Sequence, residues 1–153
     1  MNGADQTAPL LRVRGLTVDF RTMDGMVRAV DAVSFDLWPN ETIGLVGESG
    51  CGKTVTGLSL LRLIPSPPGK IVAGSIELEG RDLIALESSD MEQLRGSEIA
   101  MIFQEPMTSL NPVFTIGEQI AESLRLHKRM DRAAARAQAL RLLELVEIPA
   151  ARQ

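Results

Sequence analysis

The stretch Ile43-Gly44-Leu45-Val46-Gly47-Glu48-Ser49-Gly50-Cys51-Gly52-Lys53-Thr54 decides the fold. Its first four residues are a short apolar run, which predicts a strand buried on both faces. Residues 54–64 carry apolar side chains at helical spacing, so a helix is expected there. The segment between strand and helix matches the pattern G-x-x-x-x-G-K-[ST] at every fixed position. A strand, a glycine-rich turn and a helix in this order predict an α/β fold.

The glycine-rich segment has the chemistry of a phosphate-binding loop. Glycines let the backbone bend sharply, so that successive N–H groups face an anion, and the positive end of the following helix points at the same anion. Lys53 would reach the β- and γ-phosphates, and the Thr54 hydroxyl would ligate Mg²⁺. The alternative is a glycine-rich turn with an exposed lysine. The predicted nucleotide-binding residues are Gly47, Glu48, Ser49, Gly50, Cys51, Gly52, Lys53 and Thr54.

The rest of the chain divides into strands first and helices later. Asp24-Gly25 is a turn dipeptide between two alternating segments, which predicts an antiparallel pair. Asp131 is a candidate N-cap for the last helix. The expected strands are 11–20, 27–37, 76–80 and a buried strand 99–103 that ends at Gln104, and the expected helices are 116–128 and 132–147.

Composition excludes several classes of function. The chain has 153 residues, of which 44% are hydrophobic, and a formal net charge of -4, so it lacks the basic excess of a nucleic-acid binder. The single cysteine, Cys51, cannot form an internal disulfide. The sequence predicts neither a signal peptide nor a bilayer-spanning segment, and we expect a cytoplasmic protein.

Four stretches resemble the ATP-binding cassette (ABC) ATPases, from about residue 11 onward. They are Ala29-Val30-Asp31-Ala32-Val33-Ser34-Phe35, the loop 47–54, Ile102-Phe103-Gln104-Glu105-Pro106 and Met107-Thr108-Ser109-Leu110-Asn111-Pro112. The last is similar to a sequence typical of the branch that imports di- and oligopeptides and to the related nickel and opine systems. The resemblance implies a P-loop NTPase core with an N-terminal antiparallel β-subdomain and the start of a helical subdomain.

The same resemblance implies roles for two further residues. Gln104 matches a glutamine that touches Mg²⁺ or the attacking water, although it could instead simply end a strand. Phe20 matches the aromatic residue that stacks on adenine, although it could equally be a core residue of its strand. Metal ligation is therefore expected from Thr54 and Gln104, with ATP and Mg²⁺ as cofactors.

The expected domain organisation is a loose N-terminus at 1–9, a nucleotide-binding core at 10–104 and the beginning of a helical subdomain at 105–153. Met107, Leu110, Pro112 and Val113 form an apolar patch that serves either docking to a membrane partner or internal packing. The basic residues between 125 and 141 either approach anionic lipid or form a solvated helix face.

The expected function is ATP binding and hydrolysis that drive uptake of peptides or a related solute. The implied partners are transmembrane permease subunits, a second ATPase subunit and, indirectly, a solute-binding protein, at the cytoplasmic face of the membrane. The signature, the acidic Mg²⁺-ligand strand, the catalytic Glu and the switch His of the family do not occur before Gln153, so the chain by itself is expected to bind ATP without hydrolysing it. The alternatives are a soluble cassette ATPase of DNA repair or translation and another P-loop NTPase, either a kinase or a GTPase.

Overall fold

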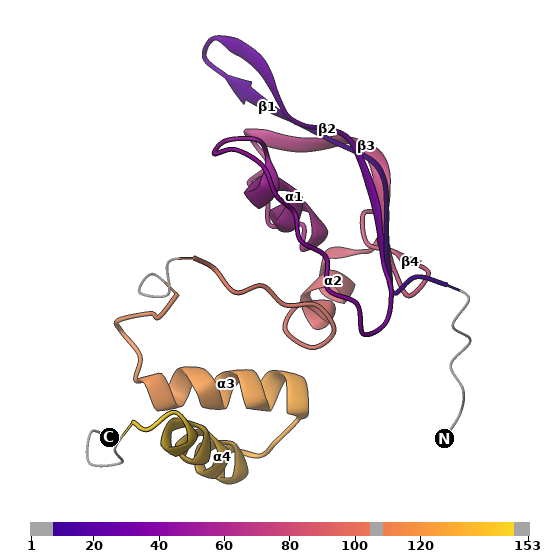
Figure 1. Cartoon of the computed structure of the whole chain (residues 1–153). Coiled ribbons are helices and arrows are strands. Elements are labelled where there is room, and N and C mark those ends of the chain that lie inside the picture. Colours follow the sequence, from indigo (N-terminus) through magenta and orange to yellow (C-terminus); the bar gives the residue numbers. More distant parts are fainter. Residues whose placement is uncertain (1–7, 105–108, 149–153) are drawn as a thin grey trace. The chain divides into compact units, whose positions relative to one another are not determined.

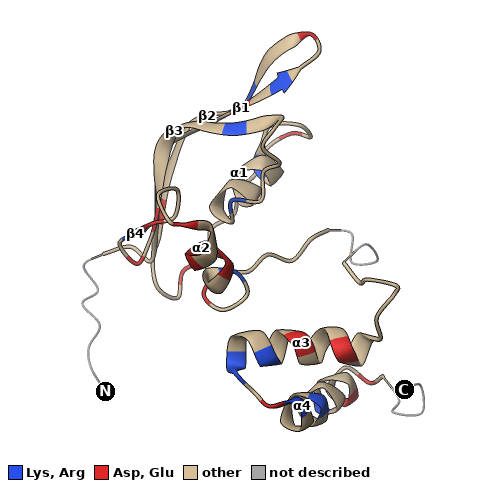
Figure 2. Cartoon of the chain, turned by 180° about the vertical axis from the view of Figure 1, so that it is seen from behind, with Lys and Arg blue, Asp and Glu red and all other residues tan. Residues whose placement is uncertain are grey.

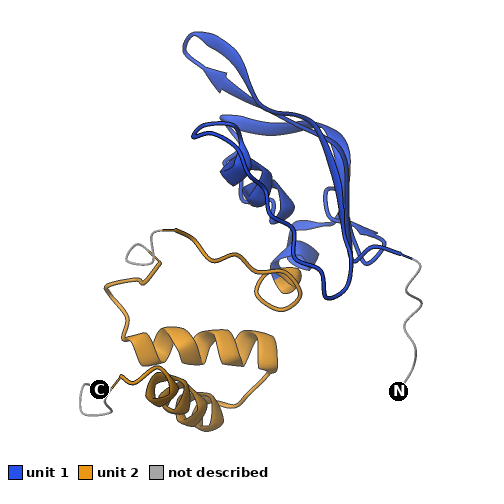
Figure 3. Cartoon of the chain, in the orientation of Figure 1, with its two compact units in different colours: residues 1–92 blue, residues 93–153 orange. Residues whose placement is uncertain are grey.

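The computed structural model describes residues 8–104 and 109–148 of the chain (Figure 1). The chain forms two compact units, residues 1–92 and residues 93–153 (Figure 3). The division falls inside helix α2 (Ser88–Leu94). The functional boundary expected at 104/105 lies within the second unit and stays a prediction.

The first unit is built on a four-stranded antiparallel sheet in the order β2-β1-β3-β4. Its strands are β1 (Leu11–Thr22), β2 (Gly25–Leu37), β3 (Gly69–Leu78) and β4 (Arg81–Asp82). The turn predicted at Asp24-Gly25 joins β1 to β2, as the pairing of Thr22 with Gly25 shows. The expected antiparallel pair is therefore confirmed, and both of its strands extend slightly beyond the predicted limits.

Strand β1 forms the centre of this unit because β2 and β3 pair with its two edges. Val13, Leu16 and Val18 are fully buried, and Ile76 of β3 lies in the same core. Helices α1 (Lys53–Leu60) and α2 lie on the same side of the sheet (Figure 1). Fully burying such an aliphatic side chain stabilises a fold by roughly 1.5–3 kcal/mol, so this core holds the sheet together.

Bulges interrupt the β1–β2 ladder, and side-chain hydroxyls bond to the backbone there. The Thr17 hydroxyl donates to the carbonyl of Gly15 and accepts from the amide of Ala32, at 3.1 Å in each case. The amide of Gly15 donates to the Ser34 hydroxyl at 2.8 Å. These bonds satisfy backbone groups that the broken register would leave unpaired.

Two segments predicted as buried strands do not form strands. Residues 43–46 make no ladder, and Val46 is 90% exposed. In residues 99–103, Ile102 is 98% exposed, and only Ile99 forms an isolated bridge, with Arg95. The strand prediction is therefore wrong for both segments in this chain. Apolar composition favours a strand, but a strand also needs a hydrogen-bonding neighbour, and among the described residues these runs have none beyond the single bridge of Ile99.

The second unit contains two capped helices, α3 (Ile116–Lys128) and α4 (Arg132–Leu145). Thr115 caps α3 by accepting from the amide of Glu118, and Asp131 caps α4 by accepting from the amide of Ala134 at 2.8 Å. The predicted cap and the bounds of α3 are confirmed. The small buried residues Ala121, Ala135 and Ala139 form the centre of this unit, with Ile120, Leu124 and Met130 packed against them. No helix within the described residues is both long and apolar enough to span a bilayer.

Candidate nucleotide-binding site

Lys53 closes the glycine-rich loop on itself. Its ammonium group donates to the carbonyl oxygens of Gly47 at 2.7 Å and Glu48 at 2.6 Å, and it contacts the Cys51 sulfur at 3.3 Å. The amide of Cys51 also donates to the carbonyl of Glu48 at 3.3 Å. The loop backbone and the Lys53 side chain thus form a closed ring, in which the ammonium group is held by two carbonyl oxygens of the loop.

Gly52 joins this loop to helix α1 and lies against strand β2. Its φ is +89°, in the left-handed region that favours glycine. A Cβ at this position would lie only 2.3 Å from the carbonyl oxygen of Ala29. Both the backbone conformation and the close approach to β2 therefore require a glycine here.

The N-terminus of α1 is open to an external acceptor. Gly52 offers no side-chain cap, and there is no acidic residue in the first turn. The first N–H groups of a helix have no partner within the helix, and together with the helix dipole they attract an anion. Thr54, in the same turn, is exposed. The donor set fits a phosphate chain, and the Thr54 hydroxyl is the type of ligand that Mg²⁺ accepts beside phosphates.

Phe20 belongs to the stretch of sheet that carries the loop. It pairs with Val27 across the β1–β2 ladder, two residues along β2 from the Ala29 carbonyl that contacts Gly52. At about 3.3 Å per residue, the two positions on β2 lie about 7 Å apart along the strand. Phe20 is half-buried. The structure thus brings this aromatic residue near the loop, and its role with adenine stays a prediction.

Gln104 lies in the second unit, directly after the segment 99–103, and it is exposed. Its exposure leaves the amide free of the core, as a sensing residue requires. Its predicted role toward water and Mg²⁺ remains untested.

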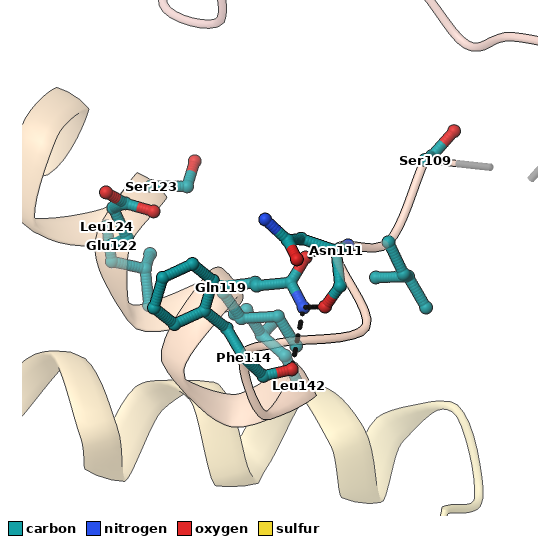
Figure 4. A pocket seen from close by; sticks show the side chains of 10 residues that line it. Ser109, Asn111, Phe114, Gln119, Glu122, Ser123, Leu124 and Leu142 are labelled. Carbon is teal, nitrogen blue, oxygen red and sulfur yellow. Dashed lines mark hydrogen bonds between the residues drawn. The ribbon is translucent and has the colours of Figure 1, made fainter. Parts of the chain in front are cut away.

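The second unit has a cavity of about 570 Å³ between the turn at 109–114 and the two helices (Figure 4). Gln119 builds one wall. Its side-chain amide donates to the carbonyls of Asn111 at 2.9 Å and Phe114 at 3.1 Å, and its oxygen accepts from the Asn111 amide at 3.0 Å. This side chain therefore ties the turn to α3.

Apolar side chains are exposed at the same turn. Val113 is 81% exposed and Phe114 57%, and Leu110 and Pro112 are also exposed. Three of the four residues of the predicted apolar patch are thus at the surface, and the fourth, Met107, falls outside the described residues. Exposed apolar side chains beside a cavity are characteristic of a protein interface.

Basic residues follow the acidic ones along α3. The ribbon colours in Figure 2 mark acidic residues on the first part of α3 and basic residues toward its C-terminal end. Glu118 lies in the first turn and Arg125, His127 and Lys128 lie in the last. This order complements the helix dipole, and whether the basic residues meet solvent or anionic lipid stays a prediction.

The glycine-rich loop that opens α1, beside an antiparallel sheet, is consistent with a fragment of the P-loop NTPase class of fold. Within this class, residues 30–153 match the family described as ABC transporter. The chain belongs to the ABC transporter family, as the resemblance of its sequence motifs predicts.

Two groups of proteins similar to this chain were found. A Brucella melitensis protein assigned to peptide import as an ATP-binding protein is 54% identical over 94% of this chain and 43% of its own length. The oligopeptide transport ATP-binding protein OppD of Bacillus subtilis is 49% identical over 92% of this chain and 39% of its own length. The chain thus spans about two fifths of the length of these curated relatives.

The solved structure of the ATP-binding cassette MJ0796, a dimer bound to ADP and Pi, superimposes with a TM-score of 0.76. The two chains are 20% identical, and the superposition covers 92% of this chain and 58% of the MJ0796 chain. At this identity the likeness concerns the fold, and it confirms the predicted α/β class.

Sequence reasoning missed two features of the site. Ala29 touches Gly52, and Gly69 lies against Phe20. Both are contacts between segments far apart in the sequence. The glycine at position 69 follows three prolines and a serine, so by pattern alone it is only the end of a turn.

Proposed function

We propose that this chain is the ATP-binding part of an ABC importer subunit. The observation that carries the proposal is the ring of loop backbone around the Lys53 ammonium group at the open N-terminus of α1. Such an arrangement offers a cation and several N–H donors to one anion, which is what a triphosphate requires.

The contacts of Lys53 indicate how a phosphate would be accepted. An ammonium group has three donors, and here they meet two carbonyl oxygens and the Cys51 sulfur. Sulfur is the weakest of these acceptors. A phosphate oxygen would replace the sulfur and leave both carbonyl contacts intact, so the lysine need not leave the loop to bind its ligand.

Three residues outside the glycines of the loop are proposed to hold the metal and the base. Thr54 would ligate Mg²⁺, Gln104 would approach the metal or the attacking water, and Phe20 would stack on adenine. Mg²⁺ bound with ATP neutralises charge on the phosphates as the γ-phosphoryl group is transferred. Gln104 is an amide directly after the segment 99–103, so it could follow the loss of that phosphate by moving.

The proposal about transport and its partners rests on the names of the relatives and on the exposed apolar surface of the second unit. OppD of Bacillus subtilis is named for oligopeptide transport. DppD of the same organism, which is 48% identical to this chain, is named for dipeptide transport. We infer that the whole protein hydrolyses ATP to drive peptide uptake, paired with a second ATPase subunit at the inner face of the membrane. The permease would dock on the apolar turn at residues 109–114 and the cavity beside it. The solute-binding protein would contact the permease and not this chain.

The 153-residue chain by itself is proposed to bind ATP with little or no turnover. Hydrolysis requires a carboxylate that activates water, and we expect none of Glu41, Glu48 and Glu105 to supply it. Glu41 and Glu48 are exposed, and Glu105 lies outside the described residues. Glu41 instead accepts a hydrogen bond from the amide of Trp38 at 2.8 Å. A magnesium-dependent turnover similar to that of complete transport ATPases would contradict this inference.

The direct test is the substitution Lys53→Ala, with Lys128→Ala as the control for loss of one lysine on an exposed helix. Hydrogen bonds to charged groups contribute about 1.5–3 kcal/mol. We therefore expect Lys53→Ala to weaken MgATP binding about 10- to 100-fold in a calorimetric titration, and Lys128→Ala to leave it unchanged. Undiminished affinity in Lys53→Ala would exclude the phosphate site proposed here.

A further inference from the structure

The ring of Phe20 lies against Gly69. A Cβ at Gly69 would be 2.8 Å from Cε1 and 3.1 Å from Cζ of that ring, and 2.4 Å from Cγ2 of Ile64. Phe20 and Gly69 also face each other in the ladder between β1 and β3. The ring thus rests in a space that exists because position 69 has no side chain.

Gly69 differs in this respect from the glycines that the backbone requires. Its φ lies outside the left-handed region, so an alanine could adopt the same backbone. Gly69 is buried, and β3 begins there. The atoms nearest to a side chain at position 69 belong to Phe20 and Ile64, so contacts with these two residues oppose a larger residue. A methyl group at distances below 3 Å must displace one of them.

We propose that Gly69 and Ile64 form a seat that orients the Phe20 ring for stacking on adenine, which makes Gly69 a positioning residue for base recognition. This inference rests on the proposed function, since it assumes that ATP binds at the neighbouring loop. Stacking requires a ring held at a defined tilt, and packed neighbours fix such a tilt by excluding the other rotamers. The half-buried ring has its Cε1–Cζ side on the seat and keeps part of its surface for a ligand.

The test compares MgATP with inorganic tripolyphosphate, which offers the phosphates without the base. Stacking of a base on an aromatic side chain contributes about 1–3 kcal/mol, or roughly 5- to 150-fold in affinity. We expect Phe20→Leu to weaken MgATP binding within this range and Gly69→Ala to weaken it about fivefold or more. Neither substitution should change the affinity for tripolyphosphate. Gly117→Ala is the matched control, because a Cβ at Gly117 meets no atom within 4 Å.

A double substitution shows whether Gly69 acts through Phe20. If it does, Gly69→Ala causes no further loss of MgATP affinity once Phe20 is leucine, because the ring that it would displace is gone. An equal loss of both ligands in Gly69→Ala, a loss that adds to that of Phe20→Leu, or no loss at all would overturn the proposal. Should Gly69→Ala fail to fold, Ile64→Ala removes the other wall of the seat and is judged by the same selective loss.

These outcomes are separate from a failure of the proposed function. If the chain binds neither ligand, or if Lys53→Ala binds both as well as the parent, the phosphate site itself is refuted. If Lys53→Ala loses both ligands while Phe20→Leu keeps its full preference for MgATP over tripolyphosphate, only the seat and the base contact are refuted.

Discussion

The carbonyl of Ala29 lies so close to Gly52 that a Cβ on the glycine would be 2.3 Å from its oxygen. Ala29 is also the residue at which the β1–β2 ladder slips, since Val18 pairs with Val30 and Asp19 with Arg28. The bulge therefore occurs where β2 meets the start of α1. The bulge in the sheet at Ala29 and the glycine in the loop at position 52 therefore belong to the same contact.

This contact predicts that Gly52→Ala damages the site through the backbone. The alanine would have to adopt a left-handed φ and push Ala29 away. Strain of this kind costs about 1–3 kcal/mol, so we expect a lower free energy of unfolding of the first unit and a loss of MgATP and tripolyphosphate binding alike. Thermal denaturation and calorimetry measure the two effects. Gly117→Ala, in α3, should leave both near the parent values, and a Gly52→Ala protein that matches this control would refute the contact.

Alkylation of Cys51 is expected to block ATP binding. The thiol is exposed, and its sulfur touches the Lys53 ammonium group, so a maleimide adduct would occupy the place of the phosphates. Cys51→Ala should bind MgATP within about threefold of the parent, because this position offers the ligand mainly its backbone. The alanine variant treated with the same reagent is the control. Full affinity after stoichiometric labelling would show that the thiol lies away from the ligand.

Asp36 makes the stability of the first unit depend on pH. The hydrogen bond from Arg14, at 2.7 Å, lowers the pKa of Asp36 below its usual 3.8. Folding therefore favours the ionised carboxylate, and this stabilisation is present above the usual pKa and disappears as pH falls through the lower pKa of the folded state. We expect Asp36→Asn to have a lower Tm than the parent at neutral pH.

The difference in Tm should shrink as the pH falls below about 4 and the parent carboxylate becomes protonated. Asp24→Asn is the control, because Asn-Gly forms the same hairpin turn as Asp-Gly. A constant difference in Tm between Asp36→Asn and the parent across the acid range would show that the ion pair is not its cause.

Gln119→Ala should loosen the turn beside the cavity of the second unit. The substitution removes an acceptor from the Asn111 amide and a donor from two carbonyls. With about 1–2 kcal/mol lost, amide hydrogen exchange at Asn111 should become roughly tenfold faster. Gln138→Ala, on α4, supplies the control. Unchanged exchange at Asn111 would mean that the glutamine does not hold the turn.

Local chemistry explains why much of the fold could be predicted. The turn at Asp24-Gly25, the N-cap at Asp131 and the limits of α3 depend on neighbours a few residues apart, and the structure has all three. The loop from Gly47 to Thr54 is also a local pattern, and a helix follows it as expected, although α1 ends at Leu60 rather than at the predicted residue 64. The domain boundary and the roles of Phe20 and Gln104 remain predictions.

The strands expected at 43–46 and 99–103 show where pattern fails. An apolar run describes what a segment can bury, whereas a strand exists only if a second segment pairs with its backbone. The residues that the structure describes provide no such ladder, so neither run forms a strand and most of their side chains are exposed.

The amino-acid sequence by itself determined the family and predicted the phosphate loop, because the motifs that carry both are particular residues at fixed spacing. Only the tertiary structure decided that Gly52 rests on Ala29, that Phe20 lies against Gly69 and that Gln119 holds the turn at 111–114. The reason is physical. Spacing along one chain sets local geometry, whereas contacts between distant segments arise from the packing of the whole unit.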